Sequence, residues 1–180
     1  MKPCNDKITV SVNPEQKSKV KINGIPFSTA LLFEKNYREK SPVLAVVVDG
    51  NNHVKRGEIL LCHHNLFYLP SPYHLYGDSF SIPFSKNIFA KILSDGSLLP
   101  ICGNMLCDRV DKVTNIPLPP EQREKYIDRV KVVDSGWSVY KEGQLLFTRP
   151  YSFYEIVYNF GGEEKRVHKC HSEMVIGFAK

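Results

Sequence analysis

The sequence predicts an all-β protein made of two small β-barrels in tandem. Several short runs are rich in β-branched and aromatic residues and are separated by turn residues, which is typical of small barrels and sandwiches. Residues 8–12 alternate between apolar and polar side chains, whereas residues 43–48 are almost all apolar. The first pattern is typical of a half-buried strand, and the second of a strand covered on both faces.

An internal repeat divides the 180 residues into two such units. Arg-Glu-Lys and Val-Val-Asp recur at the same spacing in residues 38–49 and 123–134. Two further pairs of segments align after a shift of one residue each: residues 55–61 with 141–147, and residues 85–90 with 172–177. Because the matches come in the same order in both halves, we favour a tandem duplication over a chance match of two β-rich halves.

The repeat also predicts where the two units meet. Upstream of the main alignment, two shorter pairs of segments correspond: residues 6–8 with 108–110, and residues 25–27 with 116–118. The polar turn Ser-Asp-Gly-Ser at residues 94–97 lies between the halves. We therefore expect a first domain at residues 1–95 and a second at residues 96–180.

Helix signals are weak in both halves. Residues 30–40 have the composition of a short helix that Pro42 would end, and residues 121–131 are their counterpart. A hairpin is expected in the second half, where a glycine pair at 161–162 joins two strand-like runs.

Four motifs resemble those of the GroES-type co-chaperonin family. Residues 43–46 match its V-L-A-V strand, and residues 54–61 (V-K-R-G-E-I-L-L) are similar to its V-K-x-G-D-x-V-L strand. Residues 87–92 are similar to its closing D-I-L-A-V strand, and residues 108–110 carry its opening D-R-V, which residues 6–8 resemble more loosely. The resemblance covers nearly the whole chain and implies two tandem GroES-like small β-barrels.

The same resemblance implies a function and partners. Such a protein is not an enzyme, holds no cofactor or metal, and caps a GroEL-type chaperonin, which itself binds ATP, while a client protein folds. It acts as a homo-oligomeric ring, and each subunit docks through an apolar tip on a long loop. The chaperonin-binding residues implied here are Gly24, Ile25, Pro26 and Phe27 in the first half, and Ile116, Pro117 and Leu118 in the second.

The sequence departs from the family in two ways. Only a short turn at residues 49–53 joins the V-L-A-V and V-K-x-G-D segments, so we expect the roof hairpin to be missing, as in some phage-encoded co-chaperonins. The family ring has seven subunits, which paired domains cannot supply evenly. Either one domain of each chain enters the ring, or the assembly differs.

The composition of the chain limits its expected cellular location and its expected binding partners. The net charge of +5 is spread along the chain, so we expect no nucleic-acid partner. The longest apolar run, residues 43–48, is far below the roughly 20 residues that span a bilayer, so we expect no membrane partner. No apolar core follows the first residues, which argues against a signal peptide. Five scattered cysteines suit a reducing, cytoplasmic location.

Three alternatives remain open at this point. Residues 62–64 (Cys-His-His) and 168–171 (His-Lys-Cys-His) could supply metal ligands, but they lie in different halves and lack zinc-finger spacing. The same residues could form a Cys–His nucleophile pair, without any supporting protease-like context. The chain could also be a structural or assembly protein, for example in a virus particle, that uses a doubled barrel without binding a chaperonin.

Overall fold

The computed structural model describes most of both halves of the chain. The residues it describes are 7–12, 21–22, 25–26, 42–67, 71–110, 128–149 and 152–178. Within these ranges the protein consists of β-strands and two short 3-10 turns, η3 (His64–Leu66) and η4 (Ser172–Met174). The prediction of an all-β protein is therefore confirmed.

The first half forms an antiparallel sheet with the order β6-β7-β1-β4-β5-β8-β9. Its strands are β1 (Lys7–Val12), β4 (Val43–Asp49), β5 (Ile59–Cys62), β6 (His74–Tyr76), β7 (Ser79–Pro83), β8 (Ile88–Ile92) and β9 (Leu98–Pro100). A separate pair, β2 (Lys21–Ile22) and β3 (Ile25–Pro26), lies in sequence between β1 and β4.

The second half forms an antiparallel sheet with the order β13-β14-β10-β11-β12-β15. Its strands are β10 (Asn104–Arg109), β11 (Asp128–Asp134), β12 (Leu145–Thr148), β13 (Phe153–Phe160), β14 (Glu163–His171) and β15 (Val175–Phe178). Strand for strand, this is the order of the first sheet without β9. The two units thus have the same topology.

The strand register reproduces the alignment made from the sequence. A bulge between Thr9 and Val10 places Val10 opposite Val47, and a bulge between Leu106 and Cys107 places Cys107 opposite Val132. Val47 and Val132 are equivalent positions in the repeat. A β-bulge adds twist at a defined point of a strand pair, so its recurrence at the same place is a specific structural match.

The turn before the third strand of each unit is also shared. Gly57 and Gly143 have φ angles of 87° and 79°, in the left-handed region that favours glycine. In both turns the glycine N–H donates to a strand carbonyl, that of Val47 or Val132, at 2.8 Å. The Lys-x-Gly motif is therefore explained by the backbone conformation of the turn.

One part of the sequence alignment is wrong. Asp108 and Arg109 lie at the end of β10, opposite Lys131 and Val130, and not at its start. Their structural counterparts in β1 are Ser11 and Val12, so residues 6–8 do not correspond to residues 108–110. Asp108 is exposed, and a charge is tolerated there because the core lies further back along the strand.

The helix expected at residues 121–131 is contradicted at its C-terminal end. Residues 128–131 belong to β11, which pairs with β10 on one side and β12 on the other. Val130 and Val132 are buried and Lys131 is exposed, the alternation of a half-buried strand. Residues 30–40 and 121–127 lie outside the described residues.

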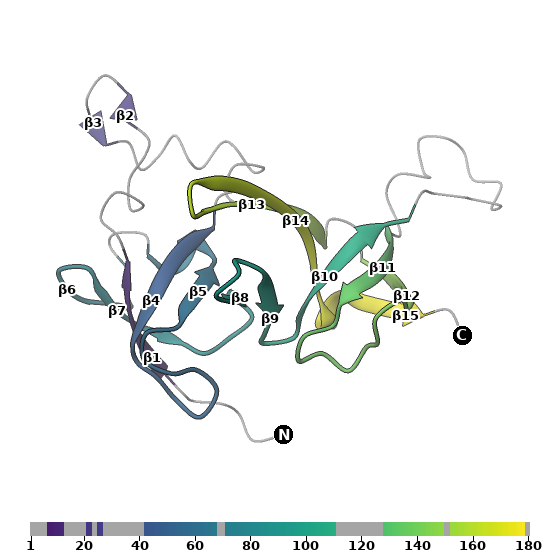
Figure 1. The fold of residues 1–180 in the computed structure, drawn as a ribbon, viewed down its shortest axis with the longest axis horizontal. Helices are drawn as coiled ribbons and strands as arrows, with labels where there is room; N and C mark the ends of the chain where they lie inside the picture. The colour runs from purple at the N-terminus through teal and green to yellow at the C-terminus, as the bar shows by residue number, and fades with distance from the viewer. Residues whose placement is uncertain are drawn as a thin grey trace.

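Within the described residues, three hydrophobic clusters stabilise the fold. One lies within the first unit, and a smaller one lies within the second. The third joins the units, because Ile156 and Tyr158 of β13 pack against Leu61, Phe89 and Ile92 of the first sheet. Figure 1 shows the β13–β14 hairpin arching from the second unit over the first.

Two further predictions concern the closure of each sheet into a barrel and the boundary between the two domains. Among the described residues the edge strands β6, β9, β13 and β15 each pair on one side only, so closure of the sheets into barrels stays a prediction. β9 belongs to the first sheet although it follows the predicted boundary at residues 95 and 96. Residues 50–58, which join β4 to β5, contain turns and no strand.

Candidate functional site

The predicted chaperonin-binding residues fall mostly outside the described part of the chain. Ile25 and Pro26 form β3, whose backbone pairs with β2. Gly24, Phe27, Ile116, Pro117 and Leu118 lie outside the described residues. The structure therefore gives a backbone position for two of the seven residues.

The long connections that carry these residues start and end at equivalent places in the two units. Val12 at the end of β1 lies opposite Ala45 in β4, and Arg109 at the end of β10 lies opposite Val130 in β11. Each connection thus leaves and re-enters its sheet between neighbouring antiparallel strands. The two predicted docking segments are attached to their units in the same way.

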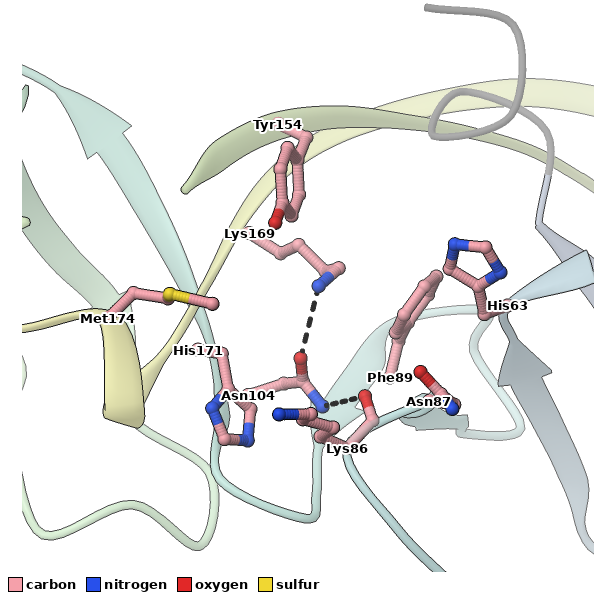
Figure 2. A pocket seen from close by; sticks show the side chains of 9 residues that line it. All are labelled: His63, Lys86, Asn87, Phe89, Asn104, Tyr154, Lys169, His171 and Met174. Atoms are coloured by element: carbon pink, nitrogen blue, oxygen red, sulfur yellow. Dashed lines mark hydrogen bonds between the residues drawn. The ribbon is translucent and has the colours of Figure 1, made fainter. Parts of the chain in front are cut away.

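A pocket lies where the two units meet, beside the β13–β14 hairpin (Figure 2). Its cavity volume is about 180 Å³, and its lining comes from both units. The lining residues are His63, Lys86, Asn87, Phe89, Asn104, Tyr154, Lys169, His171 and Met174. Among these residues, the two lysines carry positive charge.

Lys169 on β14 holds the two units together at this pocket. Its side chain is only 6% exposed, and its Nζ lies 4.2 Å from the ring centre of Phe89 and 4.8 Å from that of Tyr154. An ammonium group over aromatic faces gains electrostatic stabilisation that grows when water is excluded. Because Phe89 belongs to the first unit, this contact crosses the unit interface.

Asn104, the first residue of β10, satisfies several buried polar groups at once. Its side-chain amide Nδ2 lies 3.0–3.1 Å from the carbonyl oxygens of Lys86, Ile88 and Ile101. Its Oδ1 accepts a hydrogen bond from Lys169 Nζ at 3.2 Å. An amide is the side chain that can donate and accept at the same site, so Asn suits this position.

His171 is held as a neutral ring by its surroundings. Its Nδ1 accepts the backbone N–H of Glu173 at 3.2 Å, so the proton lies on Nε2, which donates to the carbonyl oxygen of Cys102 at 2.9 Å. Burial lowers the pKa of His171 below its usual value, against the opposing effects of the Cys102 carbonyl and the Glu173 carboxylate. Lys169 and Lys86 lower it further.

This arrangement predicts acid sensitivity. Because the pKa of His171 is lower in the folded than in the unfolded chain, the unfolded chain takes up a proton first as the pH falls below about 6.5. His171 therefore stabilises the fold above that pH and loses this contribution at lower pH. We expect His171→Gln to reduce the loss of unfolding free energy between pH 7 and pH 5, measured by urea denaturation.

A control separates this effect from general acid sensitivity. Asn87→Gln is the control, because Asn87 is exposed, also lines the pocket and has no titratable side chain, so this variant should keep the wild-type loss between the two pH values. An equal change in both variants would contradict the assignment to His171.

The volume of the pocket and the hydrogen bonds of its lining residues indicate whether it binds a small molecule or packs the two units together. Small-molecule sites usually measure about 300–1,000 Å³, above the volume found here. Lys169, Asn104 and His171 all make hydrogen bonds within the protein. The pocket is therefore better explained as a polar joint between the units than as a site for turnover of a substrate.

The described thiols are poorly suited to nucleophilic chemistry. Cys62, Cys102, Cys107 and Cys170 are free, and all except Cys102 are buried. Burial raises the pKa of Cys62 far above its usual value and that of Cys107 to about 12. Because the thiolate is the nucleophile, these two groups stay inactive at neutral pH.

The two histidine-containing segments, residues 62–64 and 168–171, are only partly brought together in the fold. His63 and His171, from different units, line the same pocket, while the His168 ring stacks on Phe153 at 4.8 Å. No group of three or more His, Cys, Asp or Glu side chains in the described part of the chain is placed to hold a metal ion. Sequence analysis missed the roles of Lys169 and Asn104, because both lie in strands that carry several other polar or charged residues and nothing in the pattern distinguishes them.

Comparison with known proteins gives no family assignment. No family model, curated protein or solved structure matches the chain. None of the helical segments described here has the length and apolar character needed to cross a membrane.

Proposed function

We propose that this chain is a co-chaperonin: a non-enzymatic lid that caps a GroEL-type chaperonin in a nucleotide-dependent way and assists protein folding. The observation that carries the proposal is the recurrence of one unit with a long connection at one place, between its first and second main strands. That is where the GroES-type family, which this sequence resembles, has its docking loop. Each unit would be a GroES-like barrel.

The docking residues we propose are those of the apolar tips. In the first unit β2 and β3 pair on either side of Asn23 and Gly24 in the sequence, and β3 contributes Ile25 and Pro26. Asn-Gly is the commonest two-residue hairpin connection, and a hairpin presents the residues that follow it in a defined register. This favours the tip Gly24 to Phe27 over the tip at residues 116–118, which has no glycine.

The expected binding free energies suit a lid that must dissociate from the chaperonin. Burying an Ile or Phe side chain in a groove contributes about 1.5–3 kcal/mol. Fixing the backbone costs about 1–2 kcal/mol per residue, so one loop binds weakly. Several loops on one oligomer bind together through their effective concentration, and a change in the nucleotide state of the chaperonin can release them all.

The test is a chaperonin pull-down with ATP and without nucleotide. We expect wild type to be retained only with ATP, and Ile25→Ser/Phe27→Ser to lose retention by tenfold or more, since each apolar contact contributes more than the roughly 1.4 kcal/mol that equals a factor of ten. The matched variant Ile116→Ser/Leu118→Ser is expected to keep most of the binding. Loss only in that second variant would assign docking to the other loop.

A different result would point to the structural alternative. If wild type is not retained in either nucleotide state, the co-chaperonin proposal is wrong for the chaperonin tested. A protein that uses its paired units only for assembly would give that result.

A further inference from the structure

The pocket between the two units has a positively charged part and an apolar part. Lys86 of the first unit and Lys169 of the second unit supply the two ammonium groups. The rings of Phe89 and Tyr154 and the side chain of Met174 supply apolar surface. Among the described residues that line the pocket, none is acidic. A molecule that carries a negative charge at one end and is apolar at the other would match both parts.

The positive potential of both lysines reaches the interior of the pocket. Asn104 contacts both residues, since its Oδ1 accepts from Lys169 Nζ and its Nδ2 donates to the Lys86 backbone carbonyl, as Figure 2 shows. Burial is the main reason that the pKa of His171 is lowered, and the charges of Lys169 and Lys86 lower it further. Because His171 lines the same pocket, both charges act on a group inside it.

The environment of Lys169 favours an anion close to it. This residue is 6% exposed, and its ammonium group contacts the rings of Phe89 and Tyr154 and the Asn104 amide oxygen, all of which are neutral. A buried charge is weakly screened by water, so an opposite charge nearby interacts with it strongly. A carboxylate in the pocket would add such a charge.

A carboxylate already contacts the other lysine beside the pocket. Glu173 Oε2 lies 2.9 Å from Lys86 Nζ and 3.7 Å from His171 Nδ1. The side chains of Lys86 and Glu173 are 55% and 63% exposed, and an ion pair this exposed is weak. A carboxylate that enters the pocket can therefore compete with Glu173 for Lys86.

The volume of the pocket limits the size of this molecule. The pocket measures about 180 Å³, and an apolar cavity of about 150 Å³ is large enough to hold benzene. A carboxylate with a few carbon atoms therefore fits, whereas a drug-sized ligand does not. An inorganic anion needs hydrogen bonds on all sides, and the apolar surface of Phe89, Tyr154 and Met174 offers none.

We propose that the pocket between the units binds a small carboxylate with a short apolar body. The carboxylate contacts the ammonium groups of Lys86 and Lys169, and the body packs on Phe89, Tyr154 and Met174. Because these contacts come from both units, the bound molecule stabilises the joint between them by mass action. The pocket binds this molecule without turnover, and the binding does not depend on the co-chaperonin function.

NMR of the full chain with ¹³C-labelled methionine methyl groups tests the proposal. Met174 lines the pocket, so its methyl signal reports binding there, and Met174→Leu assigns that signal. Sodium butyrate is added at constant ionic strength and pH. We expect a saturable shift of the Met174 signal, from which the dissociation constant follows.

Four further probes separate the contributions of charge and apolar body. Each methylene group added from acetate to propionate to butyrate should tighten binding about fourfold. Butanol, which has the apolar body without the charge, should bind at least tenfold more weakly than butyrate. Inorganic phosphate, which has the charge without the apolar body, should also bind at least tenfold more weakly.

Four variants assign the charged contacts. Lys169→Leu should weaken butyrate binding at least tenfold, because this charge is buried. Lys86→Gln should weaken it roughly twofold to fivefold, whereas Glu173→Gln should tighten it by a similar factor, because it removes the competing carboxylate. The control is Lys165→Gln, on the same strand as Lys169 but outside the lining, which should bind as wild type.

The opposite effects of Lys86→Gln and Glu173→Gln keep the test independent of folding, since both side chains are more than half exposed. The proposal is overturned if wild type shows no saturable shift, if phosphate or butanol binds as tightly as butyrate, or if Glu173→Gln weakens binding. Equal affinity in wild type and Lys86→Gln would also overturn it. The loop variant Ile25→Ser/Phe27→Ser should bind butyrate as wild type, so this proposal and the co-chaperonin proposal can fail separately.

Discussion

Asn104→Leu is expected to lower the free energy of unfolding by about 3–5 kcal/mol, although leucine is close to asparagine in size. The substitution removes the donor that contacts three carbonyl oxygens and the acceptor for Lys169, all at a side chain 1% exposed. Each buried polar group left without a partner costs about 1–3 kcal/mol, and more if it is charged. Urea denaturation at pH 7 measures the change.

The neighbouring Asn87 provides the control for this prediction. Its side chain also lines the pocket, yet the residue is exposed. Asn87→Leu should change the unfolding free energy by no more than about 0.5 kcal/mol, as is usual for surface substitutions. If the two variants were equally stable, the amide of Asn104 would not be the polar centre of this joint.

Ile156→Ala is expected to destabilise the protein by about 2–4 kcal/mol. Ile156 is 1% exposed and lies on the hairpin that covers the first sheet, so its truncation leaves a cavity between the two units. Because this cluster joins the units, the loss should reduce the coupling between them, and the first and second units should then unfold at separate urea concentrations. Far-UV circular dichroism follows both transitions, and Trp137 fluorescence follows the loss of the contact that Trp137 makes with His53 and Phe84 of the first unit.

The repeat supplies a matched control for this second prediction as well. Tyr76 pairs with Ser79 as Ile156 pairs with Val167, so Tyr76 occupies the position of Ile156, but it is 75% exposed. Tyr76→Ala should cost less than about 0.5 kcal/mol. Equal losses at the two positions would mean that the hairpin of the second unit makes no special contact with the first.

Much of the fold could be predicted because local patterns and tertiary contacts agree. Residues 43–48 are apolar and β-branched, and they form a central strand with partners on both sides. The repeat was visible because both units need the same bulge and the same glycine turn. Residues 128–131 were misassigned because Arg, Lys and Glu near them favour a helix, whereas pairing with β10 and β12 decides for a strand.

The joint between the units could not be predicted from the sequence. It depends on how far β13–β14 extends over the other sheet, which sequence periodicity does not encode. In the sequence Lys169 is only one residue of the segment 168–171, and the structure places its Nζ over the rings of Phe89 and Tyr154. His63 and His171 are far apart in the sequence, and only the packing of one unit on the other brings them to one pocket.

The most direct measurement of the proposed function is sedimentation of the fluorescently labelled wild-type chain with a GroEL-type chaperonin. With ATP present, the label should move with the chaperonin, and it should return to the slow fraction once the nucleotide is removed. A label that stays in the slow fraction whether or not ATP is present would contradict the proposal that this chain is a chaperonin lid.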